Sequence, residues 1–327
     1  MKKCVKVLLL AALAGISLVS LAADKVYELK ISTSQTEQAL ISRSYQKFAD
    51  RLLETSKGRI KAVVYPSSQL GNDEDVIEQA IQGAAVAVNT DPARMGTYVK
   101  EIGILMMGFF ADNYEECRTI TESALFKSWE EELAKKHGIR VLAFDFYDGP
   151  RHFMTNKEIK SPADLKGLRI RTIGSEVCLQ SIGAMGGTPV AMAWGEVYNA
   201  IQSKALDGCE AQNTSTLPSK LFEVTKYQTK TGHFQLMQAL ICGESWYQTL
   251  PDDLKKILVD TAHEMGAVTA KDVLAEADQA EAEMKAAGLI VNTVDTAPFK
   301  KAVEPAYEKL GYKELRDKLY KEIGKVN

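Results

Sequence analysis

Strand-like and helix-like segments alternate along this 327-residue chain from about residue 26 onward. Residues 26–33 alternate between apolar and polar positions, which is typical of a half-buried strand, and residues 37–55 show the periodicity of an amphipathic helix. The pattern repeats as strand, helix and strand over residues 59–65, 74–82 and 84–88. Such βαβ units need a sheet with helices packed against it, so the sequence predicts an α/β fold.

A second set of α/β units follows in the middle of the chain. We expect a strand over residues 139–146 and a turn at Asp148-Gly-Pro150. Ser161-Pro-Ala-Asp164 predicts a helix start, because serine caps a helix and proline fits its first position. Further strands and helices are expected over 168–171, 175–185, 189–193 and 195–204. These elements predict a second α/β lobe from about residue 149 to beyond residue 210.

Residues 252–287 show hardly any interruption of helical character. A continuous helix of that length would span about 50 Å at 1.5 Å per residue, which is longer than one lobe is wide. We therefore predict a helix that runs along both lobes. The alternative is two helices broken near Gly266, because glycine weakens a helix interior.

Residues 1–22 have the features of a removable secretory signal peptide. Lys2, Lys3 and Lys6 precede an apolar segment, and Ser20-Leu-Ala22 is a small-x-small cleavage signal with no cysteine to carry a lipid. We expect the mature protein to diffuse freely in a periplasm. The predicted lobes are residues 23–148 plus about 237–276 for lobe I and residues 149–236 plus about 277–327 for lobe II.

The composition argues against several functional classes. Removal of the signal peptide leaves 37 basic against 43 acidic side chains, a net charge of −6, which argues against nucleic-acid binding. The four remaining cysteines and the four histidines show no metal-site spacing, and no nucleotide-binding or catalytic motif occurs. We therefore expect no metal, no cofactor and no catalytic residues. We expect buried thiols, although an oxidising compartment would also permit disulfides.

Several motifs together resemble the substrate-binding proteins of TRAP transporters, the DctP-like family. They are Tyr65-Pro-Ser-Ser-Gln-Leu-Gly-Asn-Asp73, Arg151, the stretch from Ser161 to Arg171, Met192-Ala-Trp-Gly-Glu-Val-Tyr-Asn-Ala-Ile-Gln202 and Asp207-Gly-x-Glu210. The resemblance covers essentially the whole mature chain. It implies a two-lobe periplasmic-binding-protein fold, with a mixed sheet in each lobe, hinge strands, and a long helix shared by both lobes that close over an organic acid.

Arg171 is the main candidate for binding a ligand. A guanidinium donates two parallel hydrogen bonds to a carboxylate, and the resemblance implies this bidentate contact for the arginine that ends the Gly-Leu-Arg-Ile-Arg strand. Arg151 matches a second arginine that often assists. The residues alone leave both open as surface arginines. Strand alternation places Arg169 and Arg171 on the same face, so periodicity does not choose between them.

Further contacts are implied by matching the sialic-acid-binding members. They are Ser34 in a strand-to-helix loop, Asp73 and Asp91 at helix starts, and Trp194 as a cleft aromatic. For each, a structural role as cap, turn former or core side chain is an equal alternative.

Two further positions bear on the ligand's chemistry. Ala211 replaces an asparagine common in sugar-acid-binding relatives, and Gln212 or Asn213 would restore the donor after a small shift. We expect Glu210 to be a structural partner near the hinge, because an acid repels a carboxylate.

The resemblance implies a solute receptor that captures a small carboxylate and delivers it to the small and large membrane subunits of a TRAP transporter, for uptake driven by an ion gradient. Dicarboxylates, keto acids, sugar acids and aromatic or amino acids all fit one arginine clamp. A receptor for a membrane histidine kinase remains the alternative partner, because both partners would read the closed lobes. A periplasmic enzyme acting on an organic acid is the third hypothesis. We expect a monomer.

Overall fold

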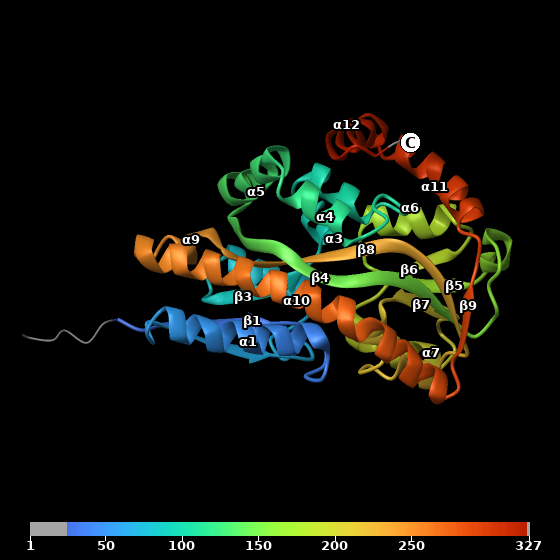
Figure 1. Cartoon of the computed structure of the whole chain (residues 1–327), viewed down its shortest axis with the longest axis horizontal. Coiled ribbons are helices and arrows are strands. Elements are labelled where there is room, and N and C mark those ends of the chain that lie inside the picture. The colour runs from blue at the N-terminus through green and yellow to red at the C-terminus, as the bar shows by residue number, and fades with distance from the viewer. Residues whose placement is uncertain (1–24, 326–327) are drawn as a thin grey trace, which may run out of the picture.

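The computed structural model describes residues 25–325, so the predicted signal peptide lies outside the described residues. Two α/β regions lie side by side, and one long helix runs diagonally across both (Figure 1). Within residues 25–325, no helix combines the length and the apolar character needed to cross a membrane.

The strands form one nine-stranded mixed sheet in the order β2-β1-β3-β8-β4-β7-β5-β6, with β9 paired to β8. Their bounds are β1 Tyr27–Ser32, β2 Ile60–Tyr65, β3 Val86–Thr90, β4 Ile139–Thr155, β5 Arg169–Thr172, β6 Thr188–Ala191, β7 Gly208–Ala211, β8 Tyr227–Gly243 and β9 Ile290–Thr293. The parallel strands β1, β2 and β3 belong to the first α/β region, and the parallel strands β5, β6 and β7 belong to the second.

Helices cover both faces of this sheet. The α-helices are α1 Leu40–Thr55, α2 Asp73–Ile81, α3 Pro92–Met95, α4 Tyr114–Thr121, α5 Ala124–His137, α6 Glu176–Ala184, α7 Val197–Gln202, α8 Asn213–Thr216, α9 Glu244–Tyr247, α10 Asp252–Ala286, α11 Ala297–Lys309 and α12 Lys313–Ile323. The 3-10 helices are η1 Lys100–Met106, η2 Pro162–Leu165, η3 Trp194–Glu196 and η4 Leu221–Glu223. The predicted helix start at Ser161 is confirmed, since η2 begins at Pro162 and the Asp164 carboxylate accepts from the Ser161 amide at 2.9 Å.

Two long antiparallel strands connect the lobes. β4 and β8 have 17 residues each and pair from Ile139 opposite Gly243 to Thr155 opposite Tyr227. β8 also pairs with β3, and β4 also pairs with β7. The two-lobe α/β fold class is confirmed, and the sheets predicted for the separate lobes are joined into one by these crossing strands.

The predicted turn at Asp148-Gly-Pro150 is wrong, because β4 continues through it. The register with β8 shifts between Tyr147 and Gly149, which marks a β-bulge. Gly149 has a φ of 106°, a conformation that glycine adopts without a steric penalty. The residues that resemble a turn therefore lie at an irregularity within a continuous strand.

Helix α10 is continuous over 35 residues, which confirms the predicted helix along both lobes and excludes a break near Gly266. At 1.5 Å per residue it is about 52 Å long. Gly266 instead permits a close approach to β4, since a Cβ atom at this position would lie 2.6 Å from the Cβ of Asp145. The glycine that weakens the helix locally is the one that lets the helix pack on the crossing strand.

The C-terminal helices tie distant parts of the chain together. The Tyr307 hydroxyl in α11 donates to the carbonyl of Gly108 at 3.1 Å, and the Tyr320 hydroxyl in α12 donates to the carbonyl of Phe110 at 2.7 Å. Both carbonyls belong to the sequence region that we predict as lobe I. The lobe boundaries given above remain our proposal. Cys117, Cys178, Cys209 and Cys242 are all buried free thiols, as expected.

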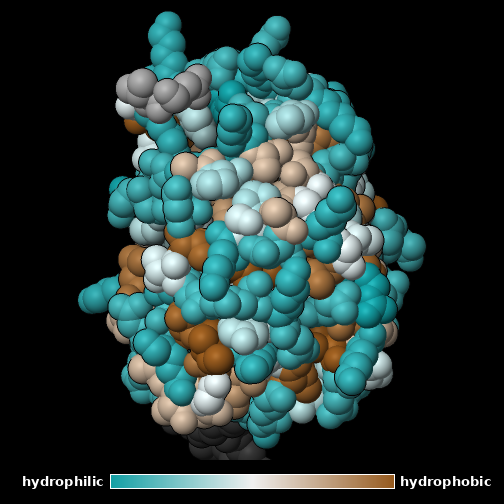
Figure 2. Space-filling view, turned by 90° about the vertical axis from the view of Figure 1, so that its right-hand side faces the viewer, coloured by the Kyte–Doolittle hydropathy of each residue, from teal (hydrophilic) through white to brown (hydrophobic). Residues whose placement is uncertain are grey.

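The end of the molecule formed by the second region carries mainly hydrophilic side chains. Figure 2 shows this face, with apolar residues scattered among polar ones. Ile290, which is 42% exposed, is one of the few large exposed apolar side chains among the described residues.

Candidate functional site

A cavity lies between the two α/β regions, near the carboxyl ends of their parallel strands. Ser34 follows β1, Asp91 follows β3, and Arg171 lies in β5. Ligands of open α/β sheets bind in the crevice outside these strand ends, because successive loops converge there. Of the predicted residues, the structure brings six to this cavity: Ser34, Asp73, Asp91, Arg151, Arg171 and Trp194.

Arg171 is a buried cation at this cavity, with a relative exposure of 2%. Its Nε donates to the backbone carbonyl of Met192 at 2.9 Å, and its guanidinium carbon lies 5.4 Å from the centre of the Trp194 ring. Among residues 25–325, no carboxylate forms an ion pair with Arg171. Burial lowers the pKa of Arg171 to about 10, so the side chain stays protonated at neutral pH and its charge is poorly compensated.

Arg151 is equally buried, but its charge is already neutralised. Its Nε forms an ion pair with Glu210, its Nη1 donates to Gln212 at 2.7 Å, and its Nη2 donates to the Glu210 carbonyl at 2.8 Å. Glu210 also accepts from the Thr172 hydroxyl at 2.8 Å and is fully buried. This confirms the structural role expected for Glu210. Arg151 therefore has fewer donors to offer a ligand than Arg171 has.

Arg169 faces a different environment from Arg171, although both belong to β5. Its side chain is 44% exposed and pairs with Asp207 at 2.9 Å, and it does not line the cavity. Of the two arginines, which strand alternation leaves open, only Arg171 lines the cavity. Arg169 is at the exposed start of β5 and Arg171 is at its buried end.

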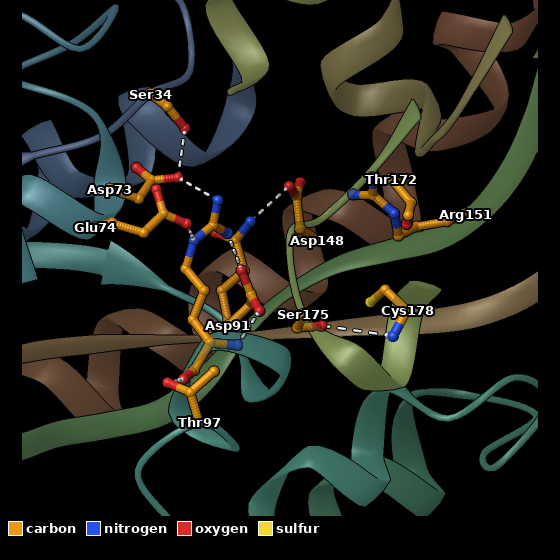
Figure 3. A network of polar contacts seen from close by, with 12 residues as sticks. Ser34, Asp73, Glu74, Asp91, Thr97, Asp148, Arg151, Thr172, Ser175 and Cys178 are labelled. Atoms are coloured by element: carbon orange, nitrogen blue, oxygen red, sulfur yellow. Dashed lines mark hydrogen bonds and ion pairs between the residues drawn. The ribbon is translucent and has the colours of Figure 1, made fainter. Parts of the chain in front are cut away.

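The opposite wall of the cavity holds an arginine that the sequence analysis missed. Arg94 forms ion pairs with Asp91, with Asp73 at 3.1 Å and with Glu74 at 2.7 Å. Ser34 donates to Asp73 at 3.2 Å (Figure 3). Burial lowers the pKa of Arg94, but the three carboxylates outweigh this and raise it. Asp91 and Asp73 therefore have structural partners as well as a place in the cavity wall.

Asp91 also caps the short helix α3, because its Oδ1 accepts from the amide of Arg94 at 3.0 Å. The signal that would have identified Arg94 is its spacing three residues after this cap, which allows both the amide and the guanidinium to reach one carboxylate. A role in binding the ligand and a role in capping α3 are therefore compatible for Asp91.

Ala211 and Asn213, which were also predicted as site residues, do not line this cavity. Ala211 is fully buried within β7. Asn213 begins α8, where its amide nitrogen donates to the Ala277 carbonyl of α10 at 3.2 Å and its oxygen accepts from Gln228 at 2.6 Å. The side chain that would restore a donor to a sugar-acid ligand is instead used to hold α8 against the long helix.

Three buried polar atoms on the cavity-lining residues have no hydrogen-bond partner: Gln35 Oε1, Thr90 Oγ1 and Gln238 Oε1. Buried polar groups are usually paired, because losing water without a replacement costs about 1–3 kcal/mol each. Together with Arg171, they leave the cavity with unused hydrogen-bonding capacity. No group of three or more His, Cys, Asp or Glu side chains suited to a metal ion occurs within residues 25–325.

Asp148 is expected to make the stability of the protein depend on pH. It is buried beside the cavity and accepts from Thr214 at 2.9 Å and from Gln212, both uncharged donors. Burial raises its pKa to about 6. Between the unfolded pKa of about 4 and this value, the folded protein holds a proton that the unfolded chain does not, so stability falls as pH rises.

We expect Asp148→Asn to remove this loss, which amounts to about 3 kcal/mol between pH 4 and pH 7. Urea unfolding of both proteins at the two pH values measures it. The wild-type free energy of unfolding should fall relative to that of the variant as pH rises. Parallel pH dependences of the two proteins would rule out a raised pKa at Asp148.

Comparisons with known proteins agree with this architecture. The family model described as bacterial extracellular solute-binding protein, family 7 (DctP), matches residues 31–314. The chain is 29% identical to the sialic acid-binding periplasmic protein SiaP of Vibrio cholerae, over 86% of this chain and 87% of that protein. It is 27% identical to the 2,3-diketo-L-gulonate-binding periplasmic protein YiaO of Escherichia coli, over 90% and 89% of the two chains.

Two solved structures of TRAP periplasmic solute-binding proteins superpose on most of the chain. One, from Ochrobacterium anthropi with bound L-fuconate, has a TM-score of 0.88 and 30% identity and covers 91% of this chain and 99% of its own. The other, from Actinobacillus succinogenes with bound L-galactonate, has a TM-score of 0.85 and 29% identity and covers 90% and 99%. The chain belongs to the DctP family of bacterial extracellular solute-binding proteins.

Proposed function

We propose that this protein captures a small organic acid in the periplasm and holds its carboxylate against Arg171. The observation that carries the proposal is a buried guanidinium that lines an interlobe cavity and has no ion-pair partner among the described residues. A buried charge without a partner is costly, and an anionic ligand supplies the missing partner. Arg151 borders the same cavity while paired with Glu210, and Asp73, Asp91, Ser34 and Trp194 contact the remainder of the ligand.

The free energy from one contact between a carboxylate and Arg171 is a substantial part of the binding free energy that micromolar affinity requires. Each charge-assisted hydrogen bond in a desolvated site contributes roughly 1.5–3 kcal/mol, and micromolar binding requires about 8 kcal/mol in total. A bidentate contact therefore supplies a large share of the affinity. The named ligands of the relatives support this choice, because sialic acid, 2,3-diketo-L-gulonate, L-fuconate and L-galactonate are all carboxylic acids.

The crossing strands suggest how capture leads to delivery. β4 and β8 connect the two lobes, so bending at Gly149 closes the lobes over the acid and removes the water that would weaken its pairing with Arg171. The closed form then presents the acid to the small and large membrane subunits of a TRAP transporter, which import it with an ion gradient.

A thermal-shift screen of organic acids on the purified mature protein tests the proposal. A ligand that binds only the folded state raises the melting temperature, so at least one carboxylate should raise it and its uncharged amide should not. The bound acid should also be recovered unchanged. Stabilisation by uncharged analogues alone would contradict the carboxylate contact, and turnover of the acid would favour an enzyme.

A further inference from the structure

A second cavity adjoins the arginine cavity. We call it the vestibule, and its walls include Thr36 and Ser68 from the first region and Tyr198, Ser219 and Leu221 from the second. Ser34 and Trp194 line both cavities, so these two side chains lie between the two spaces. The vestibule measures about 950 Å³ and the arginine cavity about 390 Å³, and both volumes include space open to solvent.

The walls of the two cavities differ in chemistry. Three arginines and two aspartates line the arginine cavity, whereas rings and aliphatic side chains line much of the vestibule: Trp194, Tyr198, Pro218 and Leu221. Aromatic and aliphatic walls bind apolar groups, because burying apolar surface is favourable and roughly proportional to the area buried. The arginine cavity is small and polar. The vestibule next to it is larger, and its apolar walls suit an apolar part of a ligand.

Two local features of the vestibule are typical of a binding site. The hydroxyl oxygens of Thr36 and Ser219, which come from opposite regions, are buried without a hydrogen-bond partner. Ser67, Ser68 and Lys220 all have φ values of 54–56°, which are unfavourable for residues other than glycine. Strained backbone persists where the surrounding structure holds it, and it gathers at binding sites.

We propose that the cargo is a carboxylic acid with an apolar substituent, alkyl or aryl, that passes Trp194 and fills the vestibule. This inference rests on the proposed function, because the carboxylate must lie at Arg171. Trp194 joins the two parts of the site, since its ring contacts the Arg171 guanidinium and also forms a wall of the vestibule. An acid too short to pass Trp194 leaves the vestibule to water and gains nothing from its apolar walls.

Calorimetry with matched acids tests the inference on the mature protein. Lactate and 3-phenyllactate share the same head group and differ by one phenyl ring, and gluconate adds a polar chain instead. Because each buried methylene group tightens binding by about fourfold, we expect 3-phenyllactate to bind at least tenfold more tightly than lactate. We expect gluconate to show no comparable gain.

Gly195→Phe provides the matching change in the protein. Gly195 belongs to the vestibule wall and a Cβ atom there meets no atom within 4 Å, so we expect a phenyl ring to fit without displacing the backbone and to occupy part of the vestibule. We expect the preference for 3-phenyllactate over lactate to fall below threefold in this variant. Ser128→Phe, on the exposed surface of α5, is the control and should keep the wild-type preference.

The outcomes separate the two proposals. If lactate and 3-phenyllactate bind equally well and the binding of both requires Arg171, the proposal of an apolar substituent is wrong. The proposed contact between the carboxylate and Arg171 would still hold. An undiminished preference for 3-phenyllactate over lactate in Gly195→Phe would also contradict the proposal that the apolar substituent fills the vestibule. If no carboxylate binds the wild-type protein, both proposals fail.

Discussion

Replacing Arg171 with lysine is expected to weaken binding of the acid that gives the largest thermal shift by at least tenfold, approaching a hundredfold. Lysine keeps the positive charge but loses the planar fork, so at least one charge-assisted hydrogen bond worth roughly 1.5–3 kcal/mol disappears. It also loses the Nε–H that donates to the Met192 carbonyl and orients the guanidinium. Isothermal titration calorimetry on both proteins measures the change.

Arg169→Lys is the matched control, because it makes the same substitution two residues away in the same strand. Arg169 pairs with Asp207 on the surface and does not line the cavity, so its replacement should change the affinity by less than about twofold, as expected for an exposed ion pair. Equal losses in the two variants would show that positive charge near β5, rather than the geometry at Arg171, governs binding.

The alternation of strands and helices was sufficient to predict the fold class and the helix along both lobes. The course of β4 was not predictable in the same way, because Asp148, Gly149 and Pro150 are typical turn residues. Only the pairing of this segment with β8, more than 80 residues later in the chain, shows that it is a bulged strand. Local propensity does not contain that information, because the partner strand supplies it.

The candidate site, too, was predictable only in part from the sequence. Arg171 was identified through its motif, but the facts that distinguish it, burial and the lack of a carboxylate partner, depend on what packs around β5. The spacing of Arg94 from Asp91 indicates one ion pair, but its pairing with Asp73 and Glu74, much earlier in the chain, depends on the fold. Asn213 was assigned to the site because a small shift would bring it to the position of an asparagine in sugar-acid-binding relatives, whereas its amide nitrogen donates to the Ala277 carbonyl of α10.

Replacing Glu210 with alanine is expected to destabilise the folded protein by about 3–5 kcal/mol, because it leaves Arg151 buried without its counter-charge. Glu210 is fully buried, and Arg151 is 4% exposed. The same change also removes the acceptor of the Thr172 hydroxyl, so three elements, β4, β5 and β7, lose their common polar contact. The midpoint of denaturant unfolding at pH 7 measures this loss.

Arg151→Met combined with Glu210→Leu separates the charge imbalance from the loss of packing. Replacing both members of a buried ion pair with apolar side chains of similar volume is often neutral for stability, so we expect the double variant to recover most of what Glu210→Ala loses. Arg169→Met, which removes the exposed pair with Asp207, should cost less than about 1 kcal/mol. If Glu210→Ala were as mild as Arg169→Met, the guanidinium of Arg151 would have to find another partner or reach water, and Arg151 would then be free to bind the ligand directly.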